Sequence, residues 1–189
     1  RHLEFVQQVH CADWDVRFIS VTEAWAQFAV AGPWARVLIN SLLDQPLTDF
    51  PFMAVGDIRL GSVTARLFRI SFTGELGFEI NVPARHGRAL WEKLMEAGKQ
   101  YDICPYGTET MHVLRAEKGY PIIGQDTDGT VTPQDLGMAW AVSKKKPDFI
   151  GKAALVASQG KERSVITGLE VWSSDAVTPL AKVLVGTKE

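Results

Sequence analysis

The sequence predicts an α+β fold in which helices pack against antiparallel sheets. Short extended segments gather between residues 52 and 82, where glycines separate them and apolar side chains recur at every second position. Segments with apolar residues at helical spacing follow between residues 85 and 119. Strands and helices that are segregated in this way favour α+β over the strict alternation of a parallel βαβ fold.

Helices and strands are predicted from the spacing of apolar residues and from terminal signals. Pro33 suits the first turn of a helix because its missing N–H would be unpaired there, and Thr108 suits an N-cap. The predicted helices are residues 1–10, 33–44, 85–99, 108–119, 133–138 and 150–158. The predicted strands are residues 17–20, 24–30, 52–55, 57–60, 64–71, 78–82, 139–143 and 164–171, the first two as a hairpin.

Composition argues against several classes of function. The chain has 189 residues and a net charge of −2, so it has no excess of positive charge with which to bind nucleic acid or an anionic membrane. No apolar run reaches the roughly 20 residues of a membrane span. Cys11 and Cys104 form neither a disulfide framework nor a metal set, which favours a reducing, cytoplasmic setting. The chain starts without methionine and ends just after a new strand pattern, so we expect a piece of a longer polypeptide.

Several common cofactor motifs are missing. Neither a G-x-G-x-x-G nor a Walker pattern occurs, so no flavin or nicotinamide dinucleotide is expected to bind this piece through a Rossmann unit. None of the four histidines has a second ligand at a recognised metal spacing, and Glu109 with His112 would be half a site, so no metal is expected. The basic run at 144–146 is interpreted as solvated turn residues, with a polyanionic tail as the functional alternative.

The first candidate for binding follows a glycine turn between two predicted strands. One face of the first strand is predicted to carry Arg66, Phe68, Ile70 and Phe72. Gly74 and Gly77 then permit a tight reversal, because glycine takes positive φ without a Cβ penalty. Glu79 lies between two large apolar residues, and strand alternation turns its carboxylate to the opposite face from both. Such a carboxylate is either solvated or serves a ligand.

The second candidate is Arg115, on the predicted helix 108–119. One interpretation is a structural ion pair with Glu79 or Glu117. The other is a site for a ligand with both a donor edge and an anion, because a carboxylate accepts two parallel hydrogen bonds and a guanidinium forms a fork with a carboxylate. Reduced folates have both groups, since the pterin shows a 2-amino group beside a ring N–H and the tail ends in carboxylates.

Five motifs, in order, resemble the glycine-cleavage T-protein (aminomethyltransferase) family. They are Phe72-Thr-Gly-Glu-Leu-Gly-Phe-Glu-Ile80, Leu114-Arg-Ala-Glu-Lys-Gly119, Gly124-Gln-Asp126, Thr132-Pro133 and Lys146-Pro-Asp-Phe-Ile-Gly-Lys152. The resemblance runs from about residue 21 to residue 169. Within that family, the amino-acid sequence between Tyr106 and Pro133 resembles the folate domain in the α subunits of heterotetrameric sarcosine oxidases.

The resemblance implies a folate-binding domain over residues 1–160, truncated at its N-terminus, and the start of a truncated C-terminal β-barrel over residues 161–189. It implies that tetrahydrofolate takes up the one-carbon unit from oxidative demethylation of sarcosine as 5,10-methylenetetrahydrofolate. Glu79, Arg115 and Phe72 are the implied folate-binding residues. Flavin and NAD are implied only in missing regions or partner subunits, and the implied protein partners are the β, γ and δ subunits of sarcosine oxidase.

The sequence departs from the family pattern at three points. Phe72 stands where the family has tyrosine, so a phenol hydrogen bond is lost, although stacking remains available. The family's catalytic aspartate is expected upstream of this chain, so Asp13 and Asp15 are not assigned that role and no catalytic residue is predicted. The closing barrel is nearly absent, so weak or no folate binding is expected from this piece alone.

Three other functions stay open at this point. The chain could belong to a stand-alone aminomethyltransferase or to a dimethylglycine-oxidising relative. It could be a non-catalytic folate-binding protein of iron–sulfur maintenance, which is disfavoured because no cysteine leads into Gly124-Gln125-Asp126. It could also be an inert scaffold that holds subunits together.

Overall fold

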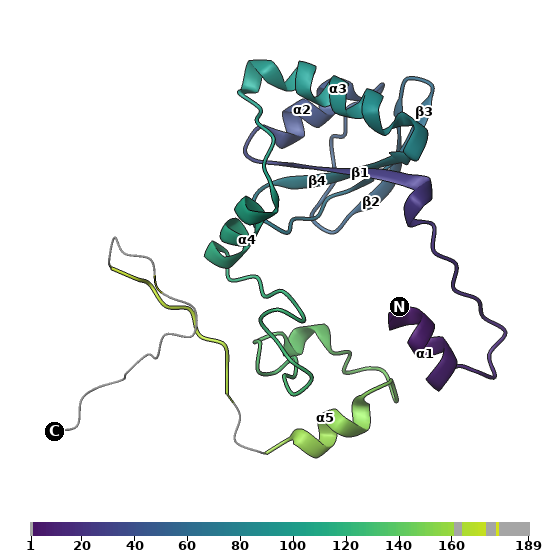
Figure 1. Cartoon of the computed structure of the whole chain (residues 1–189), viewed down its shortest axis with the longest axis vertical. Helices are drawn as coiled ribbons and strands as arrows, with labels where there is room; N and C mark the ends of the chain where they lie inside the picture. The colour runs from purple at the N-terminus through teal and green to yellow at the C-terminus, as the bar shows by residue number, and fades with distance from the viewer. Residues whose placement is uncertain (1, 161–163, 173–176, 178–189) are drawn as a thin grey trace. The chain divides into compact units, whose positions relative to one another are not determined.

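The structure, a computed structural model, describes residues 2–160, 164–172 and 177. The chain divides into two compact units, Arg1–Tyr120 and Pro121–Glu189. The first unit contains all four strands and most of the helices (Figure 1). The predicted α+β class is confirmed, because helices pack on an antiparallel sheet.

The sheet has four antiparallel strands, and its order differs from the order of the chain. The strands are β1 (Trp25–Ala31), β2 (Val55–Leu60), β3 (Val63–Phe68) and β4 (Gly77–Pro83), in the spatial order β1-β4-β3-β2. The first strand therefore pairs with the last, and β4 lies between β1 and β3. Glu79 on β4 is paired with Ala29 of β1 on one side and with Phe68 of β3 on the other.

Helices α2 (Ala35–Leu42) and α3 (Gly87–Gly98) cover one face of this sheet (Figure 1). Alternate residues of β4 point into the core beneath them, and each of these is 1% exposed: Phe78, Ile80 and Val82. The helices contribute buried apolar residues to the same cluster, among them Leu38, Ile39, Leu90 and Leu94. This burial is the main stabilising contribution that the sheet makes.

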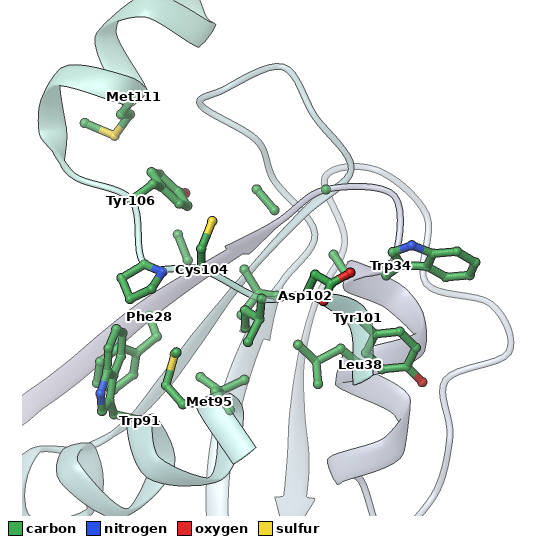
Figure 2. A pocket seen from close by; sticks show the side chains of 18 of the residues that line it. Phe28, Trp34, Leu38, Trp91, Met95, Tyr101, Asp102, Cys104, Tyr106 and Met111 are labelled. Carbon is green, nitrogen blue, oxygen red and sulfur yellow. The ribbon is translucent and has the colours of Figure 1, made fainter. Parts of the chain in front are cut away.

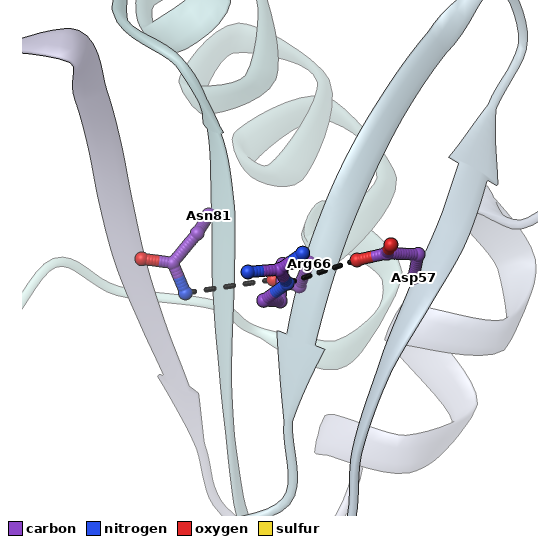
Figure 3. Close-up of polar contacts among 3 residues, drawn as sticks. All are labelled: Asp57, Arg66 and Asn81. Carbon is purple, nitrogen blue, oxygen red and sulfur yellow. Dashed lines mark hydrogen bonds and ion pairs between the residues drawn. The ribbon is translucent and has the colours of Figure 1, made fainter.

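The opposite face of the sheet is polar. Asn81 and Arg66 lie opposite each other on β4 and β3, and the Asn81 amide donates a hydrogen bond to the Arg66 carbonyl at 3.5 Å (Figure 3). The Arg66 guanidinium donates to Asp57 of β2 at 2.9 Å, and this ion pair raises the pKa of Arg66. Glu79 and Asn81 share this face, as the alternation along the strand predicts.

The glycine turn between β3 and β4 differs in part from the prediction. Gly74 has φ +82°, as expected, and a Cβ there would lie 2.4 Å from the side chain of Lys118. Gly77 does not adopt positive φ; it is the first residue of β4, and a Cβ on it would lie 2.9 Å from the Ile70 carbonyl oxygen. Close approach of two backbone segments, rather than a left-handed conformation, therefore requires glycine at position 77.

Two arginines anchor the segments around the start of β4. The guanidinium carbons of Arg36 and Arg69 each lie 5.3 Å from the centre of the Phe78 ring. Arg36 donates to the Phe50 carbonyl and Arg69 to the Gly77 carbonyl, each at 3.0 Å. Burial, and then the charge of Arg36, lower the pKa of Arg69. These contacts fix the backbone from which Glu79 projects.

The remaining helices are short. They are α1 (His2–His10), α4 (Thr108–Glu117), α5 (Lys152–Ser158) and the 3₁₀ turns Thr22–Ala24, Ala84–His86, Lys99–Tyr101 and Ala139–Ala141. The helices predicted at 1–10, 33–44, 85–99, 108–119 and 150–158 are confirmed within a few residues. Gly107, not Thr108, occupies the N-cap of α4.

Five predicted elements are wrong. The strand predicted at 52–55 is a turn, in which Met53 takes φ 69°, and β2 begins only at Val55. Residues 17–20 and 164–171 are largely exposed and form no strand, and a single 3₁₀ turn replaces the strand at 139–143. The helix predicted at 133–138 is a series of turns, in which Gly137 takes a left-handed conformation with φ 68°. The predicted barrel start at 161–189 falls mainly outside the described residues, and that domain assignment stays a prediction.

Phe72 does not lie on the strand face that its spacing from Arg66 and Phe68 predicted. Strand β3 ends at Phe68, so the shared face predicted for Arg66, Phe68, Ile70 and Phe72 stops at Phe68. Arg69 still exchanges backbone hydrogen bonds with the 53–54 segment, and the chain then leaves the sheet. Phe72 is part of the β3–β4 loop, where its side chain is 37% exposed.

Candidate functional site

Glu79 presents its carboxylate on the polar face of the sheet, between two neighbouring strands. Gln27 of β1 donates a hydrogen bond from Nε2 to Glu79 Oε2 at 2.5 Å. Gln27 and Ala29 are two residues apart and therefore face the same side as Glu79. Partial burial raises the pKa of Glu79 above its ordinary value. Among the described residues, the carboxylate is thus held by a neutral amide and forms no ion pair that would offset its partial desolvation.

A cavity of about 480 Å³ opens along the free edge of β1, and its lining includes Ala29, the register partner of Glu79, but not Glu79 itself. It is lined mostly by apolar and aromatic side chains, of which Figure 2 labels Phe28, Trp34, Leu38, Trp91, Met95, Tyr101, Cys104, Tyr106 and Met111. The rings of Phe28 and Trp91 lie 5.8 Å apart, and those of Trp34 and Tyr101 are stacked at 5.9 Å. Such a wall suits a flat, largely apolar ligand or an apolar partner segment.

Tyr106 lines this cavity from the segment that joins α3 to α4 (Figure 2). Burial raises the pKa of its phenol, and the negative charge of Glu79 raises it further. No local pattern in the sequence indicates Gln27 or Tyr106, because the β1–β4 pairing brings Gln27 to Glu79 and the path of the α3–α4 segment brings Tyr106 to the cavity.

Arg115 lies in the last turn of α4 and is half-buried. Its Nη1 donates to the Tyr120 carbonyl at 3.1 Å, and the Tyr120 N–H donates to the Arg115 carbonyl at 2.8 Å. Among the described residues, the side-chain hydrogen bond to the Glu79 carboxylate comes from Gln27, and the structural ion pair considered for Arg115 and Glu79 is not formed. The guanidinium instead donates to a backbone carbonyl just beyond the C-terminal end of its own helix.

The β3–β4 loop and helix α4 meet, which brings the predicted residues to neighbouring segments. The Lys118 side chain, just after α4, packs against Gly74 in the loop that also carries Phe72. The C-terminal end of α4 therefore touches the loop that precedes β4. Phe72 lies in that loop, Glu79 lies on the strand that follows it, and Arg115 lies on the helix.

Over residues 2–160, 164–172 and 177, no three His, Cys, Asp or Glu side chains gather in a way that would hold a metal ion. Within the same residues, none of the helices is long and apolar enough to cross a membrane. Cys11 is buried and Cys104 is exposed, and both are free thiols.

Residues 1–146 match the family described as the GCVT N-terminal domain. The chain belongs to this family. It is 56% identical over 154 residues to the sarcosine oxidase subunit alpha of Corynebacterium sp. (strain U-96), and 48% identical over 158 residues to that of Rhizobium meliloti (strain 1021). These alignments cover 79% and 82% of this chain but 16% of each relative.

The chain is also similar to aminomethyltransferases, at lower sequence identity than to the sarcosine oxidase subunits. That of Caldanaerobacter subterraneus is 35% identical over 154 residues, which cover 80% of this chain and 41% of the relative. The crystal structure of the glycine cleavage system aminomethyltransferase T from Bartonella henselae aligns with a TM-score of 0.61 and 30% identity, over 71% of this chain and 36% of that one. The family and the fold predicted from the five motifs are therefore confirmed. The chain spans less than half the length of these relatives.

Proposed function

We propose that this chain is the tetrahydrofolate-binding portion of a sarcosine oxidase α subunit. In this role it captures the one-carbon unit from oxidative demethylation of sarcosine as 5,10-methylenetetrahydrofolate. The similarity to sarcosine oxidase α subunits supports the choice of complex. The main support for this ligand is the half-buried carboxylate of Glu79, which is held by the Gln27 amide; Glu79 lies on the strand that pairs with β1, one wall of an aromatic-lined cavity.

The residues present fit a reduced folate. An ionised carboxylate has about four acceptor positions, and Gln27 uses one of those on Oε2. A pterin edge offers two parallel donors, the 2-amino group and the adjacent ring N–H, that suit the remaining positions. Because burial disfavours the charged form of Glu79, donors supplied by a ligand would restore solvation that the fold removes.

Each proposed binding residue has a separate task. Glu79 orients the pterin by its donor edge, and the partly exposed ring of Phe72 offers an aromatic surface for stacking. Arg115, whose Nη1 donates to the Tyr120 carbonyl, contributes positive charge to the binding of the folate. Bound tetrahydrofolate supplies a nucleophilic nitrogen that accepts the one-carbon unit. The contribution of this chain is to hold that nitrogen in place, which raises the effective concentration of the reacting groups.

The redox chemistry belongs to other parts of the proposed assembly. In this proposal, flavin and NAD bind to further regions of the α subunit or to partner subunits. The proposed partners are the β, γ and δ subunits of sarcosine oxidase. A stand-alone aminomethyltransferase is the second candidate, supported by 35% identity over 80% of the chain. The full open reading frame separates the two, because only the oxidase subunit is expected to carry a dinucleotide-binding region upstream.

The test uses the full-length protein in its complete complex, with wild type and Glu79→Gln compared. Calorimetric titration with tetrahydrofolate should show binding to the wild type. Glu79→Gln should weaken this binding by about 1–3 kcal/mol, because a charged acceptor is lost at a partly buried hydrogen-bonded site. Sarcosine-dependent formation of 5,10-methylenetetrahydrofolate should fall in parallel.

Asn81→Ala is the matched control, because Asn81 lies two residues further along the same face of β4. This variant should bind tetrahydrofolate as the wild type does. Equal affinity of wild type and Glu79→Gln would show that Glu79 does not bind the pterin. Absence of tetrahydrofolate binding to the intact wild-type complex would overturn the proposed function.

A further inference from the structure

The face of the sheet that carries Glu79 is arranged in rows of side chains that run across the strands. Residues that are direct partners in the register point to the same face. One row consists of Ala29, Glu79, Phe68 and Val55, and the next row consists of Gln27, Asn81, Arg66 and Asp57. Glu79 is the one polar residue of its own row. Any hydrogen-bond donor to its carboxylate must therefore come from another row, from another segment or from a ligand.

Gln27 is the side chain of the neighbouring row that turns to Glu79. Its direct partner in the register is Asn81, and Glu79 is its diagonal neighbour, a separation that a long side chain spans. Gln27 Nε2 donates to Glu79 Oε2 at 2.5 Å. The other donors of this row have partners of their own, because Asn81 donates to the Arg66 carbonyl and Arg66 donates to Asp57 (Figure 3). Within the described part of the chain, Gln27 is therefore the residue of this face that holds the carboxylate.

The sheet offers no second donor on the other side of Glu79. Ala29 is its direct partner on β1, and the next pair along the two strands is Ala31 and Gly77. Alanine and glycine have no side-chain donor or acceptor. In the described strands, no side chain on that side therefore competes with a ligand for the carboxylate.

The hydrogen bond to Glu79 also fixes the orientation of the Gln27 amide. An ionised carboxylate only accepts hydrogen bonds, so the NH₂ group of the amide must face it. The carbonyl oxygen Oε1 is then directed away from the carboxylate. Gln27 is exposed, and no hydrogen bond to its Oε1 occurs within the described residues. The amide therefore presents a further acceptor beside those of Glu79.

We propose that Gln27 is a positioning and specificity-determining residue of the folate site: its NH₂ group fixes the Glu79 carboxylate, and its carbonyl oxygen accepts a hydrogen bond from the 2-amino group of the pterin. This inference rests on the proposed function. The 2-amino group has two hydrogens. One of them, together with the adjacent ring N–H, binds Glu79, and the other binds Gln27. The two residues thus select a ring that has an exocyclic amino group next to a ring N–H.

The experiment compares Gln27→Met with wild type in the full-length complex, by calorimetric titration with tetrahydrofolate and with its 2-deamino analogue, which has hydrogen in place of the amino group. Methionine keeps the length of the side chain and removes both amide groups. Gln27→Met should weaken tetrahydrofolate binding about tenfold, because a hydrogen bond to a charged group is lost. The preference for tetrahydrofolate over the analogue should fall about fivefold, because the analogue lacks the hydrogen that Gln27 accepts. A loss of packing alone would weaken both ligands equally and leave this preference unchanged.

Asn81→Ala is the matched control, because Asn81 is the direct register partner of Gln27 and lies on the same face. This variant should keep both the affinity and the ligand preference of the wild type. Thermal unfolding of each variant checks that the fold is retained. If Gln27→Met does not fold, Gln27→Val carries the same comparison, because valine suits a strand and is too short to reach Glu79.

A double-mutant cycle tests whether Gln27 acts through Glu79. Gln27→Met combined with Glu79→Gln should lose less tetrahydrofolate affinity than the product of the two single losses, because both residues act on the same group of the ligand. Losses that multiply without coupling would overturn the positioning role.

The remaining outcomes separate this inference from the proposed function. Unchanged tetrahydrofolate affinity in Gln27→Met, with a clear loss in Glu79→Gln, would overturn the inference and leave the proposed function standing. An unchanged preference between the two ligands would overturn the contact with the amino group. Absence of tetrahydrofolate binding to the intact wild-type complex would instead overturn the proposed function itself.

Discussion

The two faces of strand β4 differ in what they contribute to the protein. On one face, Phe78, Ile80 and Val82 are 1% exposed and pack beneath α2 and α3. On the other face, Glu79 and Asn81 point away from the helices, and Glu79 accepts a hydrogen bond from Gln27. The buried face stabilises the strand, and the polar face uses that rigid strand to hold a carboxylate. A binding group placed on a central strand is positioned more accurately than one on a loop.

On the polar face, partial burial has an energetic cost for the ionised carboxylate. Glu79 is charged in water, and its partial burial raises its pKa because the charged form loses solvent. Residues of the buried face gain free energy from the same removal of water. Substitutions on the two faces should therefore change different properties: unfolding on the buried face, and ligand affinity with its pH dependence on the polar face.

The largest expected effect is on the buried face. Phe78→Ala should destabilise the protein by about 3–5 kcal/mol, because it removes a buried ring and leaves a cavity. The ring also contacts the guanidinium groups of Arg36 and Arg69. Denaturant unfolding measures the change, with Phe72→Ala as the control from the exposed loop. Equal destabilisation by both variants would contradict the division between the faces.

A smaller loss of stability is expected where β4 begins. Gly77→Ala should destabilise by about 1–3 kcal/mol, because the added Cβ would lie 2.9 Å from the Ile70 carbonyl oxygen and backbone must shift. Gly107→Ala is the matched control, since a Cβ there meets nothing within 4 Å. The two melting temperatures measure the difference. A Gly77→Ala protein as stable as the Gly107→Ala protein would show that the loop yields without strain.

On the polar face, Glu79 should give a modest pH dependence of stability. Its folded-state pKa is raised above the unfolded value, so the folded state binds a proton more readily. The associated stabilisation is present below the unfolded pKa and is lost as pH rises through the folded pKa. Glu79→Gln should remove this dependence, as measured by the difference in unfolding free energy between the variant and wild type across acidic pH. A difference that is constant with pH would contradict it.

Tetrahydrofolate affinity should have the opposite pH dependence. Ligand donors bind the ionised carboxylate, so affinity should increase as pH rises through the pKa of free Glu79.

The smallest effect is expected from the exposed ion pair on the same face. Arg66→Gln removes the partner of Asp57, whose side chain is 57% exposed, and solvent screens such pairs. The melting temperature should stay within measurement error of the wild-type value. A clear drop would mean that the polar face contributes to stability as well as to binding.

The alternation of residues 78–82 was enough to predict the strand, its buried face and the opposite orientation of Glu79, because side-chain direction in a strand follows from local backbone geometry. The motifs around Glu79 and Arg115 were enough to predict the family. Strands predicted at 17–20 and 164–171 failed for a physical reason: an extended segment needs a partner strand, and apolar alternation does not show whether one exists. The helix predicted at 133–138 is interrupted at Gly137, which takes a left-handed conformation with φ 68°.

The sequence by itself determined which face of β4 carries the carboxylate and which family the chain belongs to. Tertiary structure alone decided what surrounds that carboxylate. Gln27 is 52 residues away from Glu79 in the chain, and it reaches the carboxylate because β1 pairs with β4 rather than with β2. Tyr106 lines the cavity at the edge of β1 because the segment after α3 passes that edge. Strand pairing and chain path depend on the packing of the whole unit, and no local pattern of residues specifies them.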